Sequence, residues 1–196
     1  MRLLVVTFLA SCAALAQTQS PVLPPLTNTV RLKWATVSTV GVPNLAGGLF
    51  SSGWSTLFNH PPEYGPHWEG FGKRYGMRLT GSATSNAMEA GLGSLWGEDP
   101  RYHPVGSSES PGRRLKNALK QAFVARDRNG KTMPAYARYA AIPGSNFLSN
   151  TWRADSEAQA HDALVRTGLG FAARITANVF TEFWPDVNKH VFRRRN

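Results

Sequence analysis

Apolar residues recur at spacings of three and four along most of the chain, which is the period of an amphipathic helix. Helices are predicted over residues 28–40, 43–58, 67–97, 113–126, 134–141 and 156–183. Stretches rich in proline and glycine separate them, and Asp127-Arg128-Asn129-Gly130 predicts a tight hairpin turn. Because strand-type alternation is scarce, the sequence predicts an all-α fold, a single helical bundle.

Local signals predict the ends of the last two helices. Pro143-Gly144 is expected to end the helix over 134–141, because proline lacks the amide donor that a helix interior needs. Ser156 followed by Gln159 has the pattern of a capping box at the start of the last helix, and Trp184-Pro185 is expected to end it.

The predicted helix over 67–97 has one face without bulky side chains. This stripe consists of Gly72, Gly76, Thr80, Ala83, Ala87, Gly91 and Ser94. Each glycine costs a helix about 1 kcal/mol relative to alanine, so close contacts along the stripe are expected to offset that cost. We therefore expect these small residues to pack against a second helix, the one over 156–183. The same face also offers a route to self-association.

Residues 1–16 have the pattern of a cleaved Sec-type signal peptide. Arg2 precedes a short apolar core, and Ala14-Leu15-Ala16 forms a small-x-small cleavage site. Residues 17–26 then form an extended leader, and residues 27–196 form the helical domain. In the alternative, Leu9-Ala10-Ser11-Cys12 is a lipobox and Cys12 carries the lipid. Both interpretations predict an exported protein, periplasmic or associated with the outer membrane.

The chain is strongly basic, with a formal net charge of +10 over 196 residues. For an exported protein this charge excludes nucleic acid as the expected partner and favours an anionic membrane or an envelope polymer. The densest basic run is at the C-terminus, where Arg193, Arg194 and Arg195 are candidate contacts to such a surface. The alternatives are a solvated basic surface without a partner and a frayed terminus.

Several weakly polar segments have tryptophan near their ends, which is also a pattern of membrane proteins. Their charged residues include Glu89, Arg138, Arg166 and Arg174, and no window holds about twenty predominantly apolar residues. The mean hydropathy of −0.29 favours a water-soluble domain. A water-soluble bundle is therefore expected, and an integral helical membrane protein is the alternative.

Acidic residues are the main candidates for catalysis. Glu89 is the single charge between Leu79 and Gly97, so in a buried position it needs a partner, and Arg174 is the expected one. An envelope hydrolase using Glu89, Glu98 or Asp99 is the enzymatic alternative, with His103 as a weaker candidate. Glu98 and Asp99 stand at the end of a helix, where their charge is unfavourable.

Three ways of compensating that charge are open. Arg101 or a bound cation can neutralise the acids, or Asp99 can cap a new helix with Pro100 at its first position. The spacing of Glu98, Asp99 and His103 matches no recognised zinc pattern. No metal and no cofactor are therefore expected.

Three motifs are distinctive when taken together. They are Phe71-Gly72-Lys73-Arg74-Tyr75-Gly76, Trp96-Gly97-Glu98-Asp99-Pro100-Arg101-Tyr102 and Glu182-Phe183-Trp184-Pro185-Asp186. With them the chain resembles members of an uncharacterised family of exported bacterial proteins. The resemblance implies a shared fold and export, and it implies no activity, cofactor or catalytic residue. The function expected from the sequence is a non-enzymatic structural or binding module of the cell envelope.

Overall fold

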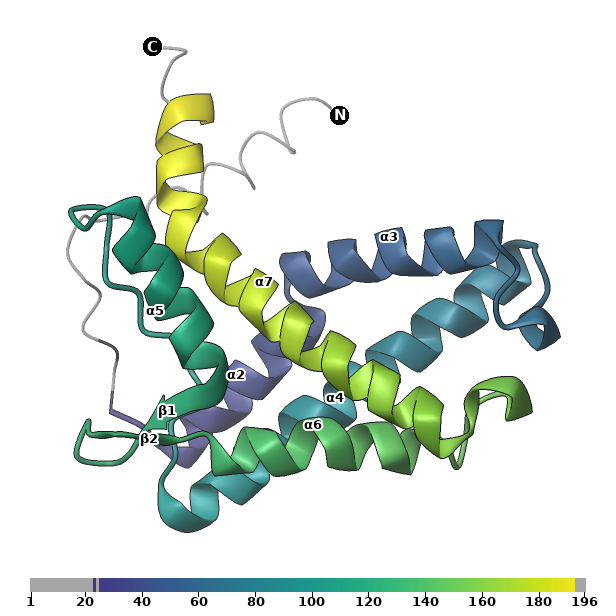
Figure 1. Cartoon of the computed structure of the whole chain (residues 1–196), viewed down its shortest axis with the longest axis horizontal. Coiled ribbons are helices and arrows are strands. Elements are labelled where there is room, and N and C mark those ends of the chain that lie inside the picture. Colours follow the sequence, from purple (N-terminus) through teal and green to yellow (C-terminus); the bar gives the residue numbers. More distant parts are fainter. Residues whose placement is uncertain (1–22, 24, 193–196) are drawn as a thin grey trace.

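The computed structural model describes residue 23 and residues 25–192 (Figure 1). The predicted signal peptide, Cys12, most of the leader and the arginines at 193–195 lie outside the described residues.

The described chain is mainly helical, which confirms the all-α prediction. Its helices are α2 (Asn28–Val40), α3 (Val42–Leu57), α4 (Trp68–Trp96), α5 (Pro111–Phe123), α6 (Tyr136–Ser149) and α7 (Ala160–Phe192), with 3-10 turns η1 (Pro62–Tyr64) and η2 (Asp155–Glu157). Strands β1 (Val124–Arg126) and β2 (Thr132–Pro134) form an antiparallel hairpin in which Arg126 lies opposite Thr132. The predicted Asp-Arg-Asn-Gly turn joins these two strands.

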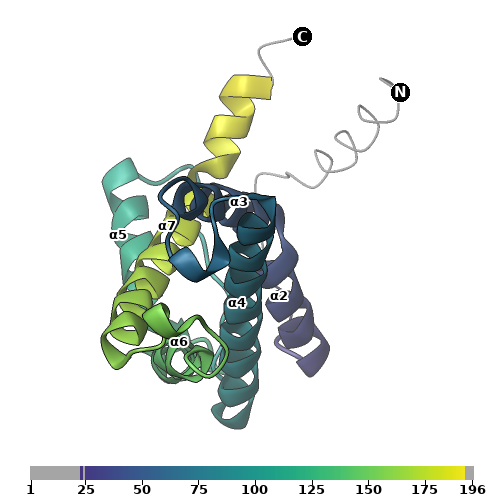
Figure 2. The same cartoon turned by 90° about the vertical axis from the view of Figure 1, so that its right-hand side faces the viewer.

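Helix α4 is the central element of the bundle. It packs against α2, α3 and α6, whereas α7 packs against α5 and α6. In both views the last turns of α7 extend beyond the other helices (Figures 1 and 2). Two helical layers therefore meet where α4 contacts α6, and the long loop from α4 to α5 crosses near that junction.

Two prolines and one serine differ from their predicted roles. Pro143 lies inside α6 and Pro185 inside α7, so neither ends its helix. Ser156 lies in η2 and donates from its hydroxyl to Glu63 (Oγ–Oε2, 2.9 Å) instead of capping α7. Packing against neighbouring helices compensates for the hydrogen bond that an internal proline removes, and such tertiary contacts are invisible to a local pattern.

The small-residue stripe of α4 faces outward, so the predicted packing through it is wrong. A Cβ added at Gly72, Gly76 or Gly91 would meet no atom within 4 Å, and Ala83 and Ala87 are exposed. The opposite face of α4 is turned inward and carries the buried side chains of Arg74 and Glu89. Arg74 donates to backbone carbonyls of the segment after α3, and Glu89 pairs with α6 and α7. The spacing defines a face of the helix but cannot tell which face the neighbours cover.

Close backbone approach occurs at other glycines. A Cβ at Gly93 would lie 3.2 Å from the Glu98 carbonyl oxygen and 3.5 Å from the Cβ of Ala137, where α4 meets the start of α6. A Cβ at Gly48 would lie 2.8 Å from the Tyr75 ring, where α3 meets α4. Tight helix contacts through glycine are therefore present, but they do not involve the predicted stripe.

Candidate functional site

The interior of the bundle is polar. Among the residues that the structure describes, the buried hydrophobic ones are eight alanines and Ile142. The buried charged residues are Arg31, Arg74, Glu89, Glu98, Asp99, Arg114, Arg138 and Glu182. Charged side chains are almost never fully buried unless they are paired, so the partners of these groups decide what they do.

Glu89 is the centre of a buried ion cluster that joins three helices. Its side chain is 1% exposed, and its Oε1 accepts from Arg138 Nε at 2.9 Å. Its Oε2 accepts from Arg174 Nη2, so the structure brings together the two residues paired from the sequence. Burial lowers the pKa of Arg174, and the charge of Glu89 opposes that shift. Both carboxylate oxygens are thus occupied, which leaves Glu89 no position as a general acid.

Glu98 caps the start of α6. Its Oε2 accepts from the backbone N–H of Ala137 (3.0 Å) and from Trp96 Nε1 (2.9 Å). Helix α6 has no capping side chain of its own, and a carboxylate is favourable at the positive end of a helix. Arg31 donates to the backbone carbonyl of Glu98 at 2.6 Å and so ties α2 to the same point. Glu98 therefore has a structural role.

Asp99 begins no helix, so the predicted N-cap is wrong. It forms an isolated bridge with Arg126 of β1, and its carboxylate accepts from Arg101 at 2.7 Å (Nη2–Oδ2). His103 Nε2 lies 3.5 Å from Asp99 Oδ2, and burial lowers the pKa of the imidazole while Asp99 raises it. Arg101 is thus the compensating group among the three considered. In the described part of the chain no three His, Cys, Asp or Glu side chains gather as metal ligands.

A fourth buried carboxylate, Glu182, is not among the candidate site residues expected from the sequence. It accepts from the Tyr102 hydroxyl, from the backbone N–H of Val105 and Gly106 (both 3.3 Å), and from Arg114 Nε (3.3 Å). Burial and the Glu182 carboxylate raise the pKa of Tyr102 above its ordinary value. The loop after α4 and the C-terminal half of α7 therefore meet at one carboxylate.

Arg114 completes this cluster from α5. Burial lowers the pKa of its guanidinium, but hydrogen bonds to Asp186 and Glu182 outweigh that effect and raise it. Its guanidinium also lies 4.3 Å from the centre of the Phe183 ring. Two of the three motifs noted in the sequence are thus in contact. The available signal is the pair of acids Glu182 and Asp186, four residues apart on one helix face.

The acids considered for hydrolysis each have partners within the fold. Acid–base hydrolysis needs two groups that reach one substrate atom from a common cavity. Glu89 is held by two arginines and Glu98 by a helix start, and neither described cavity is lined by a carboxylate. The buried charges therefore hold the helices together.

Large apolar side chains, in contrast, lie on the surface. One outward face of α3, the α3 face, consists of Val42, Leu49, Phe50, Trp54, Leu57 and Phe58. Leu57 is 80% exposed and Trp68, at the start of α4, is 84% exposed. Between α3 and the start of α4 lies a groove of about 680 Å³, lined mainly by apolar side chains that include Leu49, Leu57 and Phe71. Apolar area of this extent on a monomer is typical of an interaction surface.

The basic residues gather elsewhere. Exposed cations on α5 and the β-hairpin are Arg113, Lys116, Lys120, Arg126, Arg128 and Lys131. The α3 face itself has no charge, since the segment from Trp34 to Pro62 contains no Asp, Glu, Lys or Arg. The molecule therefore offers an apolar surface and a basic surface on different elements.

Within residues 25–192, no helix combines the length and the apolar character needed to cross a bilayer. Comparison with protein-family models, with curated proteins and with solved structures found no match for this chain.

Proposed function

We propose that this chain is a non-enzymatic binding module of the cell envelope that docks on an anionic membrane surface. One observation carries the proposal: large apolar side chains of α3 point outward, while the buried residues of the described chain are mainly alanines and charged or polar side chains. An apolar face exposed to water is unfavourable, and burial recovers about 1.5–3 kcal/mol for each large side chain. A membrane surface supplies the missing apolar contact.

The chemistry of the exposed groups favours lipid. Trp54 and Trp68 are exposed beside the groove, and tryptophan is enriched where apolar chains meet headgroups. The cations of α5 and the β-hairpin add long-range attraction to anionic headgroups, worth about 1 kcal/mol for each cation near the surface. Docking thus combines an apolar contact on α3 with a weaker, salt-sensitive electrostatic contribution.

Vesicle sedimentation tests the proposal. We expect the chain to bind vesicles that contain phosphatidylglycerol, and to bind neutral phosphatidylcholine vesicles more weakly. Leu49→Ser with Leu57→Ser, both on the α3 face, should lower the affinity about tenfold or more. The control is Leu164→Ser with Val165→Ser, which removes comparably exposed apolar groups from α7.

Equal losses in the two double variants would contradict the assignment to α3, and absence of binding to anionic vesicles would contradict the function.

Fractionation of cells distinguishes peripheral docking from an integral membrane protein. Release from membranes by high salt or carbonate supports peripheral docking, whereas a requirement for detergent supports an integral helical protein.

A further inference from the structure

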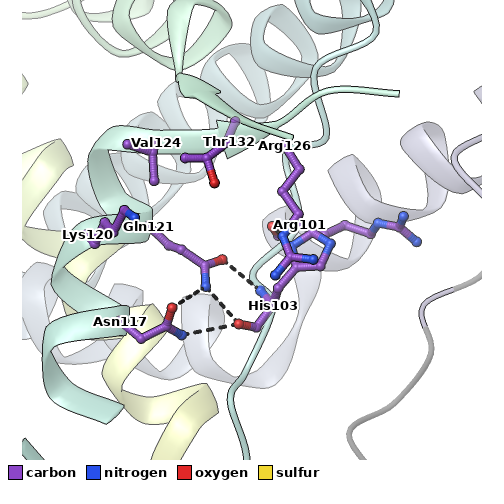
Figure 3. A pocket seen from close by; sticks show the side chains of 9 residues that line it. Arg101, His103, Asn117, Lys120, Gln121, Val124, Arg126 and Thr132 are labelled. Carbon is purple, nitrogen blue, oxygen red and sulfur yellow. Dashed lines mark hydrogen bonds between the residues drawn. The ribbon is translucent and has the colours of Figure 1, made fainter. Parts of the chain in front are cut away.

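A small polar cavity lies between the loop after α4, helix α5 and the β-hairpin (Figure 3). Its volume is about 140 Å³, enough for a phosphate-sized group and too small for a nucleotide. It is lined by Arg101, His103, Asn117, Lys120, Gln121, Val124, Ala125, Arg126 and Thr132. The lining contains basic and neutral hydrogen-bonding side chains and no carboxylate.

The loop wall of this cavity is fixed by two amides of α5. Gln121 accepts from the backbone N–H of His103 (2.8 Å) and donates to its carbonyl (2.7 Å). Asn117 donates to the same carbonyl (3.2 Å), and its own oxygen accepts from Gln121 (2.9 Å). Figure 3 shows both amides directed at the His103 backbone. The cavity is therefore preformed in the folded chain.

Two cations at the cavity lack a counter-ion. Neither Lys120 nor Arg126 makes an ion pair with any residue that the structure describes. Arg101 differs because it is paired with Asp99, which balances its charge. Lys120 and Arg126 come from different elements, α5 and β1, so the folded structure places two uncompensated positive charges at one cavity. Such an arrangement attracts an oxyanion.

We propose that this cavity binds a phosphate group, with Lys120 and Arg126 as its charged contacts and the Thr132 hydroxyl as a neutral donor. The group can belong to free phosphate or to a lipid headgroup. The inference rests on the proposed function only for the second source, because the cavity is separate from the α3 face.

The probe is inorganic phosphate, titrated into the chain at constant ionic strength with chloride as the reference anion. We expect saturable shifts of the His103 backbone amide and of the Gln121 side-chain amide in NMR spectra. Lys120→Gln with Arg126→Gln should weaken phosphate binding about tenfold or more. The matched control is Lys116→Gln with Lys131→Gln, which removes the same charge from α5 and the β-hairpin at exposed positions outside the cavity.

Shifts that do not saturate, or equal losses in the two double variants, overturn the inference. Where phosphate binding saturates, vesicles that contain phosphatidic acid distinguish free phosphate from a lipid headgroup as the occupant. If phosphate competes with these vesicles and the cavity variant binds them more weakly than the control, a headgroup occupies the cavity. If phosphate binds while vesicle binding is the same in both variants, the cavity takes free phosphate. Vesicle binding without phosphate binding supports the proposed function and overturns the inference that the cavity binds phosphate.

Discussion

Two buried carboxylates, Glu89 and Glu182, have both oxygens occupied by donors that are distant in the sequence. Glu182 shows how much a single side chain organises, since it accepts from a tyrosine hydroxyl, two backbone amides and an arginine. Leaving a buried acceptor without one of its donors costs about 1–3 kcal/mol of folding free energy. Removal of any one donor is therefore expected to destabilise the fold. Tyr102 is the donor whose contribution depends most clearly on pH.

We expect the stability contributed by Tyr102 to be lost in alkali. Because its pKa in the folded state is raised above the ordinary 10.0, the folded chain keeps the phenolic proton that the unfolded chain releases. The contribution is therefore fully present below that ordinary value and falls as pH rises above it. Tyr102→Phe should cost about 1–2 kcal/mol at about pH 8, and this difference should shrink towards about pH 11.

Denaturant unfolding across this pH range measures the effect. Tyr136→Phe, at an exposed tyrosine, is the control and should follow the wild type at every pH. Parallel pH profiles for the Tyr102 variant and the wild type would contradict the expectation.

Single residues are predictable from the sequence where they interrupt an apolar context. Glu89 stands alone in a long uncharged stretch, so its burial and its need for an arginine follow from composition alone. Arg138 carries the same signal, because it is the only charged residue between Lys131 and Arg153. Glu182 lies four residues before Asp186, and nothing local marks it as buried. Their role depends on which helix faces meet, which is a property of the tertiary fold.

Among the elements, helix α6 depends on a residue outside its own sequence. Its first turn carries no capping side chain, and Glu98 from the loop after α4 accepts from the Ala137 amide. The helices themselves are predictable because their apolar period extends over several turns. The ends of the helices are less predictable, because Pro143 and Pro185 are tolerated inside helices that neighbouring elements support.

We expect Glu98→Ala to destabilise the fold by about 2 kcal/mol, because Trp96 and the start of α6 both lose an acceptor. Glu98→Gln should cost less, since the amide oxygen can accept both hydrogen bonds. The measurement is denaturant unfolding followed by tryptophan fluorescence. Glu69→Ala, an exposed acid in the first turn of α4, is the control and should cost much less. Equal costs for the Ala and Gln variants would show that the acceptor at Glu98 is not what matters.

At the scale of the whole molecule, the Glu89 cluster connects α4, α6 and α7 at one point. The sequence predicts the all-α class and the Glu89–Arg174 contact, but it misplaces the packing face of α4. A stripe of small residues and a stripe of buried polar residues both follow the helical period. Only the partners of Glu89 decide which stripe lies inside, and these partners are distant in the sequence.

Glu89→Gln should therefore destabilise the whole bundle. Removing the carboxylate leaves two guanidinium groups in the interior without their counter-ion, and breaking a buried pair costs about 3–5 kcal/mol. A lowered midpoint of thermal unfolding, seen by circular dichroism, measures this loss. Asp155→Asn removes the same charge from an exposed position and should leave the midpoint nearly unchanged. Similar midpoints for both variants would mean that the cluster does not hold the three helices.

The alanine interior has a thermal consequence. The heat capacity change of unfolding comes mainly from apolar area newly hydrated in the unfolded chain, and the exposure of polar groups reduces it. Here many of the bulky apolar side chains are already exposed to solvent in the folded chain, and the buried apolar side chains are mostly the methyl groups of alanine. Isolated in water, this bundle should have a shallow curve of stability against temperature, with little weakening in the cold. Contact with lipid would sharpen that curve, because the membrane would then cover the apolar area that the core lacks.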